Sequence, residues 1–232
     1  MFAAARSDPG LVLLEGFHAL KHALRFGAEV VAAATSDRAA LERLAAELAP
    51  DVAEPIGALV AERPLAGLVD RIPHTGVVAV AVRPAFAAGL VLDAPGAAPA
   101  VLLEDPRHLG NVGAVVRVAA AAGAAGVLTT GPRDPWDPAA VRGSAGLHFA
   151  LPVGRVDPDA LGPRPLVALD PEGEPVGALP AGALLAFGTE RHGLSRGLAA
   201  RAELRARIPM RPGVSSLNLA TAVAVVLYAS LR

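Results

Sequence analysis

The sequence has no cysteine among its 232 residues, and aromatic residues make up only 3% of it. The absence of cysteine excludes disulfides, thiolate metal ligands and a cysteine nucleophile, and it fits a reducing compartment. Lysine is almost absent as well, since Lys21 is the only one. A phosphate-binding loop of the G-x-x-x-x-G-K-[ST] type is therefore excluded. The first ten residues, MFAAARSDPG, lack the apolar core of a secretion signal, so we expect a cytoplasmic protein.

The charges nearly cancel, and the net charge of −1 gives no general argument for binding nucleic acid. They are unevenly placed, however, because residues 1–98 carry 8 basic and 11 acidic groups while residues 99–232 carry 13 and 11. Six arginines gather between Gly188 and Arg211, which predicts either a local basic patch or a solvated helix face. With 53% apolar residues the chain is long enough to bury one large core or two small ones.

Strand-like and helix-like stretches alternate in the first part of the chain. We expect strands over 11–16, 29–35 and 75–82, and helices over 17–27 and 37–50. Proline, glycine and alanine dominate the stretch that follows. The sequence therefore predicts a domain over 1–84, a linker over 85–99 and a second domain over 100–232.

The second part alternates in the same way. We expect strands over 100–104, 126–131, 165–170, 183–188 and 207–210, and helices over 111–123, within 134–146, over 194–205 and over 213–232. Repeated alternation of strand and helix predicts an α/β fold with a parallel sheet covered on both faces.

The last helix has no charged side chain between Pro212 and Leu231. Its length would suit a membrane span, but Ser215, Ser216 and Asn218 lie near its start. A soluble helix that is apolar all round is buried on all sides. We therefore expect no membrane span but a helix packed against the sheet and against a partner subunit, with its polar start at a binding site.

Three loops follow strands that end near residues 104, 187 and 208. Ligands of open α/β sheets bind outside such strand ends. In the helix that follows the first loop, Gly113 and Arg117 lie on one face. The glycine would leave space above the arginine, which would face a phosphate. Alternatively, Asn111 is only a helix cap and Arg117 only pairs with a surface carboxylate. No G-x-G-x-x-G follows any strand, which argues against a nicotinamide-dependent oxidoreductase. His18 and His22 have no third ligand nearby, so no metal is expected.

The quoted residues carry a resemblance to a family. "NVGAVVR" with its upstream "LLED", then "FGTERHGLS", then "IPMRPGVSSLNLATAVAVVLY" resemble the three motifs of the SpoU (TrmH-like) RNA 2′-O-ribose methyltransferases of the SPOUT superfamily. "LVLLEGFHALKHALRFGAEV" and "HTGVVAVAV" are similar to the family's small substrate-binding domain, which resembles an RNA-binding ribosomal protein. The resemblance implies a SPOUT-type parallel sheet with a deep trefoil knot and a homodimer formed through the C-terminal helix.

It also implies S-adenosylmethionine as cofactor and structured RNA, ribosomal more than transfer RNA, as substrate. The implied cofactor-binding residues are Gly188, Ile208, Met210 and Leu217, and the implied catalytic residues are Asn111, Arg117, Glu190, Ser216 and Asn218. Arg117 would hold the phosphate beside the reacting ribose, because a guanidinium keeps its proton at neutral pH. Arg191 stands where the family usually has glycine, and Val118 where threonine is common. A non-catalytic RNA-binding protein with the same fold is the alternative.

Overall fold

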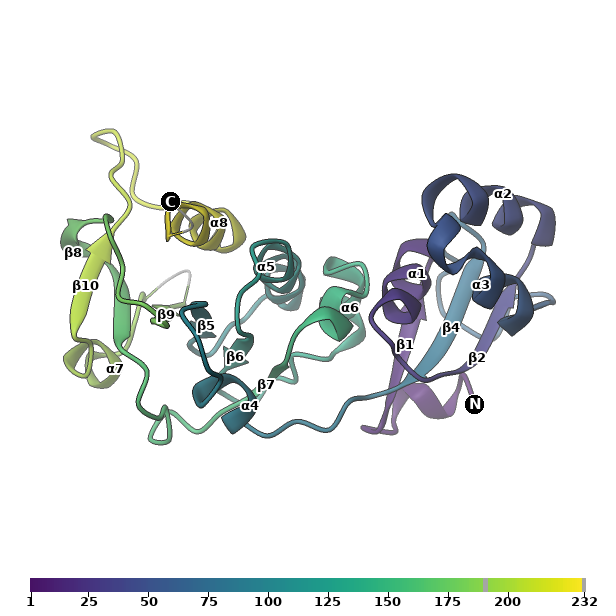
Figure 1. Cartoon of the computed structure of the whole chain (residues 1–232), viewed down its shortest axis with the longest axis horizontal. Coiled ribbons are helices and arrows are strands. Elements are labelled where there is room, and N and C mark those ends of the chain that lie inside the picture. Colours follow the sequence, from purple (N-terminus) through teal and green to yellow (C-terminus); the bar gives the residue numbers. More distant parts are fainter. Residues whose placement is uncertain (190–191, 231–232) are drawn as a thin grey trace. The chain divides into compact units, whose positions relative to one another are not determined.

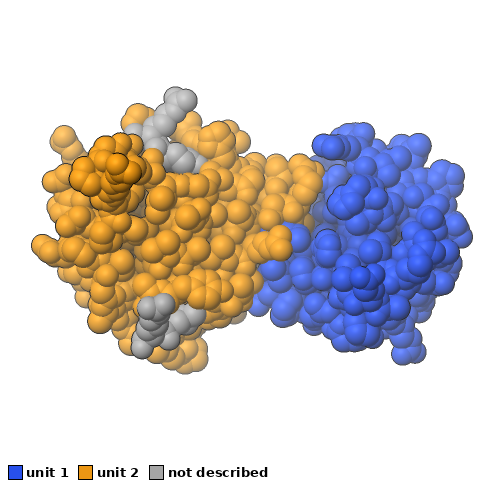
Figure 2. Space-filling view, turned by 90° about the horizontal axis from the view of Figure 1, so that it is seen from above, with its two compact units in different colours: residues 1–85, 144–150 blue, residues 86–143, 151–232 orange. Residues whose placement is uncertain are grey.

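The computed structural model describes residues 1–189 and 192–230, and it divides into two compact units. Unit 1 comprises residues 1–85 and 144–150, and unit 2 comprises residues 86–143 and 151–232 (Figure 2). Among the described residues, no helix is long and apolar enough to cross a membrane.

Unit 1 is built on a four-stranded sheet with the strand order β1-β4-β2-β3 (Figure 1). Its strands are β1 (Leu11–Glu15), β2 (Val30–Thr35), β3 (Val60–Glu62) and β4 (Val77–Val82). Its helices are η1 (Ala4–Arg6), α1 (Phe17–Arg25), α2 (Arg38–Leu48), η2 (Pro50–Val52) and α3 (Ala53–Leu59). β4 runs antiparallel to β1 and β2, and only β2 and β3 are parallel. The expected parallel sheet is wrong for this unit, because β4 returns without the helical crossover that a parallel pair needs.

A short segment from much later in the chain completes unit 1. Ser144–Ala150, which contains η3 (Leu147–Ala150), packs on α1. His22 Nδ1 lies 2.7 Å from the Ala145 carbonyl oxygen, and a Cβ on Gly146 would lie 2.6 Å from the Ala19 oxygen. Burial lowers the pKa of His22. Gly146 therefore allows two backbones to meet where any side chain would separate them.

Unit 2 contains a six-stranded sheet with the order β10-β8-β9-β5-β6-β7, and every pair in it is parallel. Its strands are β5 (Ala100–Leu103), β6 (Val127–Thr129), β7 (Val153–Arg155), β8 (Leu166–Pro175), β9 (Leu184–Phe187) and β10 (Leu204–Arg207). Its helices are α4 (Gly89–Leu92), α5 (Leu109–Ala121), α6 (Pro138–Gly143), α7 (Arg196–Ala200) and α8 (Leu219–Ser230). The parallel α/β sheet expected for the second part of the chain is confirmed.

The stretch expected to be a linker, 85–99, is largely packed into unit 2. Val91 and Leu92 of α4 are buried in the core, and the ring of Phe86 lies where a side chain on Gly154 would otherwise be. Arg164 is buried beneath this stretch, and burial lowers its pKa. Its guanidinium donates hydrogen bonds to four carbonyl oxygens, those of Val91, Ala94, Ala98 and Gly182. The stretch is therefore held as part of the unit 2 fold.

Three predictions near the C-terminus are wrong in their boundaries. The helix expected over 194–205 and the strand expected over 207–210 are replaced by the short helix α7 and by β10. In β10 the exposed Arg205 and Arg207 alternate with the buried Ala206, which is the period of a strand. The helix expected from residue 213 begins only at Leu219, because Asn218 caps it.

Candidate functional site

A cavity of about 420 Å³ lies at the carboxyl ends of β9 and β10, beside Leu169, Asp170 and Pro171 in the middle of β8. Because these strands are parallel, their following loops meet at one edge of the sheet, where ligands of α/β proteins bind. The segment 211–218 and the first turn of α8 complete the wall. The lining residues are Leu169, Asp170, Pro171, Phe187, Gly188, Thr189, Gly193, Ala206, Arg207, Ile208, Met210, Ser215, Ser216, Leu217, Leu219 and Ala222.

All four residues that the resemblance assigns to the cofactor line this cavity, namely Gly188, Ile208, Met210 and Leu217. Gly188 has a steric reason to be glycine. The loop after β9 folds back through a bridge between Thr189 and Gly193, and a Cβ on Gly188 would lie 2.0 Å from the Gly193 carbonyl carbon. Any side chain at this position would push the loop away from the strand and reshape the wall.

Three of the expected catalytic residues lie close to the start of α8. Ser216 lines the cavity. Asn218 accepts hydrogen bonds at Oδ1 from the backbone N–H groups of Ala220 (3.0 Å) and Thr221 (3.4 Å), which is the geometry of an N-cap. Its Nδ2 donates to Asn111 Oδ1 at 3.3 Å. Asn218 therefore links the first turn of α5 to the first turn of α8, and these two helices pack side by side (Figure 1).

The space expected above Arg117 does not exist. A Cβ on Gly113 would lie 2.1 Å from the Ala140 oxygen and 2.9 Å from the Gly143 Cα, so the backbone of α6 fills the position. Gly113 allows α5 and α6 to pack closely. The prediction that it leaves space for a phosphate above Arg117 is therefore wrong. Arg117 itself is exposed on α5 and is not among the residues that line the cavity. The interpretation of Asn111 as the α5 cap is also wrong, since the cap is His108.

Glu190 and Arg191 lie outside the described residues. The loop that contains them is described up to Thr189 and again from His192, and Thr189 and Gly193 exchange two backbone hydrogen bonds of 3.0 Å. The predicted roles of Glu190 and Arg191 stay predictions.

Two further contacts at this edge escaped the sequence analysis. Glu104, at the end of β5, accepts a hydrogen bond at Oε2 from the Ser195 N–H at 2.7 Å. Asp170 lines the cavity and pairs with Arg205 at 2.7 Å. The Glu172 N–H and the Arg205 guanidinium hold the pKa of the Asp170 carboxyl below its usual range. Each acid is the last residue of a predicted strand, which was the available signal for a site at the sheet edge.

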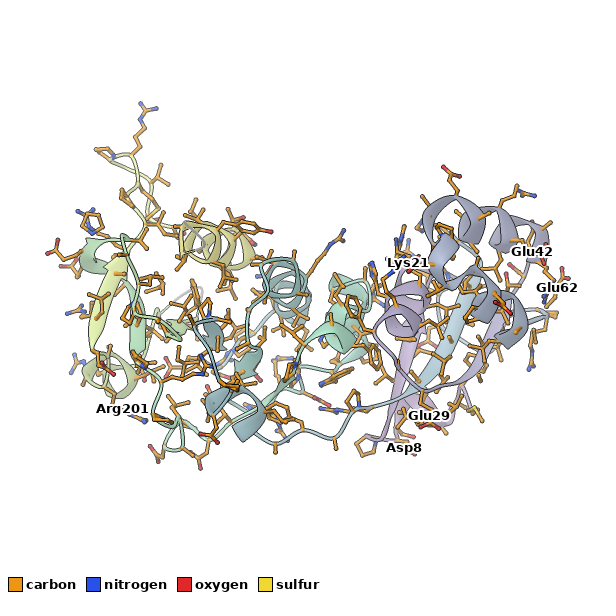
Figure 3. All side chains as sticks on the ribbon, in the orientation of Figure 1. Asp8, Lys21, Glu29, Glu42, Glu62 and Arg201 are labelled. Carbon is orange, nitrogen blue, oxygen red and sulfur yellow. The ribbon has the colours of Figure 1, made fainter. Side chains whose placement is uncertain are left out.

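The arginines between Gly188 and Arg211 do not form one helix face. Of the arginines in this stretch that the structure describes, only Arg196 lies within a helix, and Arg205 is paired with Asp170. Arg201, labelled in Figure 3 at the end of α7, donates to the Pro158 carbonyl oxygen. Arg207 and Arg211 are exposed. The helix-face alternative is therefore wrong, and the exposed arginines of this stretch come from α7, β10 and the loop that follows it.

The residues of the cavity carry no cluster suited to a metal. In the part of the chain that the structure describes, no group of three or more His, Asp or Glu side chains is placed to hold an ion.

The fold and the cavity together define an α/β protein that binds a small organic ligand at the carboxyl edge of a parallel sheet. Comparison with known proteins then gives the family. The chain belongs to the SpoU rRNA Methylase family, whose model matches residues 98–228.

Two curated relatives show how far the similarity extends. A 23S rRNA (uridine(2479)-2′-O)-methyltransferase of Streptomyces viridochromogenes is 34% identical over 155 residues, which are 57% of this chain and 52% of that protein. The chain thus spans about half the length of this relative. The 23S rRNA (guanosine-2′-O-)-methyltransferase RlmB of Bordetella pertussis is 33% identical over 241 residues, 95% of this chain and 96% of that protein.

Solved structures match the whole chain as well. The SpoU methyltransferase AviRb from Streptomyces viridochromogenes, crystallised in complex with the cofactor AdoMet, has a TM-score of 0.79 and 25% sequence identity. The match covers 100% of this chain and 95% of that one. The resemblance noted in the sequence is therefore confirmed at the level of the family.

Proposed function

We propose that the protein is an S-adenosylmethionine-dependent 2′-O-ribose methyltransferase that acts on structured RNA, ribosomal RNA more than transfer RNA. The observation that carries the proposal is the cavity at the carboxyl ends of β9 and β10, beside the middle of β8, where the second and third motifs meet. Membership of the SpoU family supports it, as do the names of the relatives, which are 2′-O-methyltransferases of 23S rRNA.

The cavity has the size and chemistry that such a cofactor needs. Its volume of about 420 Å³ is within the range of small-molecule sites. Leu217, Ile208 and Met210 supply apolar surface, while the Ser215 and Ser216 side chains and the Gly188 backbone supply polar groups. These residues would hold S-adenosylmethionine, which supplies a methyl group on a sulfonium sulfur for transfer to a ribose 2′-oxygen.

The catalytic roles follow from the groups around this edge. The ribose hydroxyl must face the methyl group and lose its proton, and the neighbouring phosphate must be fixed. We assign the phosphate to Arg117, whose guanidinium is exposed and presents a planar fork of donors. Ser216 would orient the hydroxyl from the cavity wall, and Glu190 would help to position it through a hydrogen bond. The contact between Asn111 and Asn218 would keep α5 and α8 in register while RNA is bound.

Unit 1 is proposed to bind the RNA, as the family's substrate-binding domain over 1–84. Its composition argues for shape recognition over general attraction to phosphate, because acids outnumber basic groups in unit 1 by 10 to 8. Asp8, Glu29, Glu42 and Glu62 illustrate this acidic surface in Figure 3. An rRNA substrate would place the protein in the cytoplasm.

We also propose that the C-terminal segment forms a trefoil knot and that α8 forms a homodimer interface. Membership of the SpoU family supports the first. The second is supported by the exposed apolar face of α8, where Val225 is 40% and Tyr228 49% exposed while Val223, Val226 and Leu227 are buried. A second copy of α8 would cover that face.

The activity is tested by transfer of a labelled methyl group from S-adenosylmethionine to ribosomal RNA. The methylated ribose is then mapped. We expect label in RNA and a single modified 2′-oxygen. Cofactor binding and RNA binding without any transfer would instead favour the non-catalytic RNA-binding alternative. The same assay on transfer RNA decides between the two substrate classes.

A further inference from the structure

Glu104 makes an unusual link between two loops at the cavity edge. Its Oε2 accepts a hydrogen bond from the N–H of Ser195, which lies 91 residues further along the chain, at 2.7 Å. Ser195 is the N-cap of α7, and its own Oγ accepts from the Leu198 N–H at 3.2 Å. Both residues belong to unit 2.

The link replaces a contact that a helix normally makes within itself. In a capping box, a Glu or Gln at the third helical position accepts the N–H of the capping Ser. The third position of α7 is Leu198, whose side chain cannot accept a hydrogen bond. The carboxylate comes from the end of β5 instead, so the start of α7 is tied to a neighbouring strand of the sheet.

The same residue also holds the other end of the loop. The Glu104 backbone N–H donates to the Phe187 oxygen at 2.9 Å, at the point where β9 ends. Between these two anchors the loop folds back through the hydrogen bonds of Thr189 and Gly193. Phe187, Gly188, Thr189 and Gly193 all line the cavity. Glu104 thus clamps both ends of one cavity wall, without itself being among the lining residues.

We propose that Glu104 is a positioning residue that fixes the shape of the cofactor cavity by anchoring the loop after β9. This inference rests on the proposed function, since its effect is measured on S-adenosylmethionine. The expected signature is a change in cofactor affinity without a matching change in turnover, because Glu104 shapes the wall and does not touch the reacting groups.

Glu104→Ala should raise the Kd for S-adenosylmethionine about tenfold, as expected for the loss of one charge-assisted hydrogen bond. The KM for the cofactor should rise equally, and kcat should stay within about twofold. Glu104→Gln keeps an acceptor oxygen of the same reach and should recover most of the affinity. Calorimetric titration and steady-state kinetics on the full chain give these values.

Two changes at Ser195 separate the anchor from the helix cap. Ser195→Ala removes Oγ and keeps the N–H, so it should lower the melting temperature and leave the Kd within about twofold of the wild type. Ser195→Pro removes the N–H at a φ of −61°, which proline adopts without strain, and it should reproduce the loss of affinity of Glu104→Ala. Glu203→Ala, at another exposed acid of unit 2, is the charge control and should change nothing.

The outcomes for the inference and for the proposed function differ. A wild-type protein that does not bind S-adenosylmethionine contradicts the proposed function. A wild-type protein that binds it, with an unchanged Kd in Glu104→Ala and Ser195→Pro, overturns only the inference, as does a fall in kcat at constant KM. If Glu104→Ala does not fold, the comparison of Ser195→Pro with Ser195→Ala decides, and equal affinities in that pair overturn the inference.

Discussion

The two units of this chain pair their strands by different rules. The sheet of unit 1 is mixed, with β4 antiparallel to both of its neighbours, whereas every pair in the sheet of unit 2 is parallel. In unit 1 the carboxyl end of β4 points to the edge opposite to those of β1, β2 and β3. In a parallel sheet all carboxyl ends reach the same edge, and the loops that follow them converge there.

This difference accounts for the position of the candidate site. The cavity in unit 2 takes its wall from the middle of β8 and the ends of β9 and β10, which are close in space although Arg207 follows Leu169 by 38 positions in the sequence. In unit 1, β1, β2 and β3 also end at one edge, but no residue of unit 1 lines the cavity. The pair between Arg25 and Asp51 is an ion pair on its surface. We therefore expect changes at the cavity edge of unit 2 to reduce cofactor binding or methyl transfer. Matched changes in unit 1 should leave cofactor binding unaffected.

The largest effect is expected from Gly188→Val. A Cβ at this position would lie 2.0 Å from the Gly193 carbonyl carbon and 2.2 Å from the Leu194 nitrogen, so the loop after β9 must move. We expect loss of S-adenosylmethionine binding by calorimetry and destabilisation of unit 2 by more than about 3 kcal/mol. Trp136, the only tryptophan, is buried in unit 2, and its fluorescence reports the unfolding of that unit.

The matched control is Gly57→Val in α3 of unit 1. A Cβ built on Gly57 meets open space beyond its own helix, so a side chain there displaces no neighbouring segment. Cofactor affinity should not change. If Gly188→Val binds S-adenosylmethionine as the wild type does, the cavity at the sheet edge is not the cofactor site.

Arg117→Ala should reduce methyl transfer at least about a hundredfold while cofactor affinity stays within about twofold. The reason is that Arg117 is exposed on α5, away from the residues that line the cavity, and is assigned to the RNA phosphate. Labelled-methyl transfer and calorimetric titration measure the two quantities. Arg133→Ala, at another exposed arginine of unit 2, is the control and should keep full activity. A loss of cofactor affinity in Arg117→Ala would move this residue into the cofactor site.

The sequence predicted the parts of this site that depend on local pattern. The strand ends after residues 103 and 187 follow from short apolar runs, and the family motifs placed Gly188, Ile208 and Met210, which do line one cavity. The start of α8 was predicted six residues early. An uncharged stretch does not reveal where a helix begins, and the signal was the capping side chain of Asn218.

Long-range backbone contacts were beyond such patterns. Gly113 was interpreted as open space, but the backbone of α6 fills that position. The packing of Ser144–Ala150 on α1 depends on a close approach at Gly146, and nothing in a run of small residues tells which partner they meet. The four carbonyl acceptors of Arg164 could not be predicted either, because main-chain oxygens leave no mark in the sequence.

Arg164→Ala should destabilise unit 2 by about 2 kcal/mol, because it removes the guanidinium that donates to the carbonyl oxygens of Val91 and Gly182 in buried hydrogen bonds. Denaturant unfolding followed by Trp136 fluorescence measures this. The matched change in unit 1 is Arg38→Ala. Arg38 also donates to two carbonyl oxygens, those of Gly57 and Val60, but its side chain is 40% exposed and water can replace it. Equal effects of the two changes would show that burial of Arg164 contributes nothing.

Val225→Glu should weaken the proposed homodimer by at least about tenfold, because it buries a carboxylate in the apolar face of α8. Sedimentation at several protein concentrations measures the dissociation constant. Leu48→Glu, at an exposed leucine of α2 in unit 1, is the matched apolar-to-acid control and should leave assembly unchanged. A dimer that withstands Val225→Glu does not use this face of α8.

The smallest effect is expected from removing the acid of an ion pair, and each unit has one such pair to compare. Asp170 in unit 2 and Asp51 in unit 1 both have a pKa below the ordinary range for aspartate, through the Glu172 N–H and Arg205 in the first case and through Arg25 in the second. A lowered pKa in the folded state adds stability at neutral pH, and this stability is lost as the pH falls through the folded value. Asp170 is mostly covered, with 18% of its side chain exposed, whereas the Asp51 side chain is 50% exposed. Asp170→Asn should therefore destabilise the protein by about 1 kcal/mol at neutral pH, and the difference from the wild type should shrink as the pH falls below the ordinary pKa of aspartate, about 4. Asp51→Asn should have no measurable effect, because water and salt screen an exposed pair. An equal loss in both variants would mean that the sheet edge of unit 2 gives its acid no advantage over a surface pair.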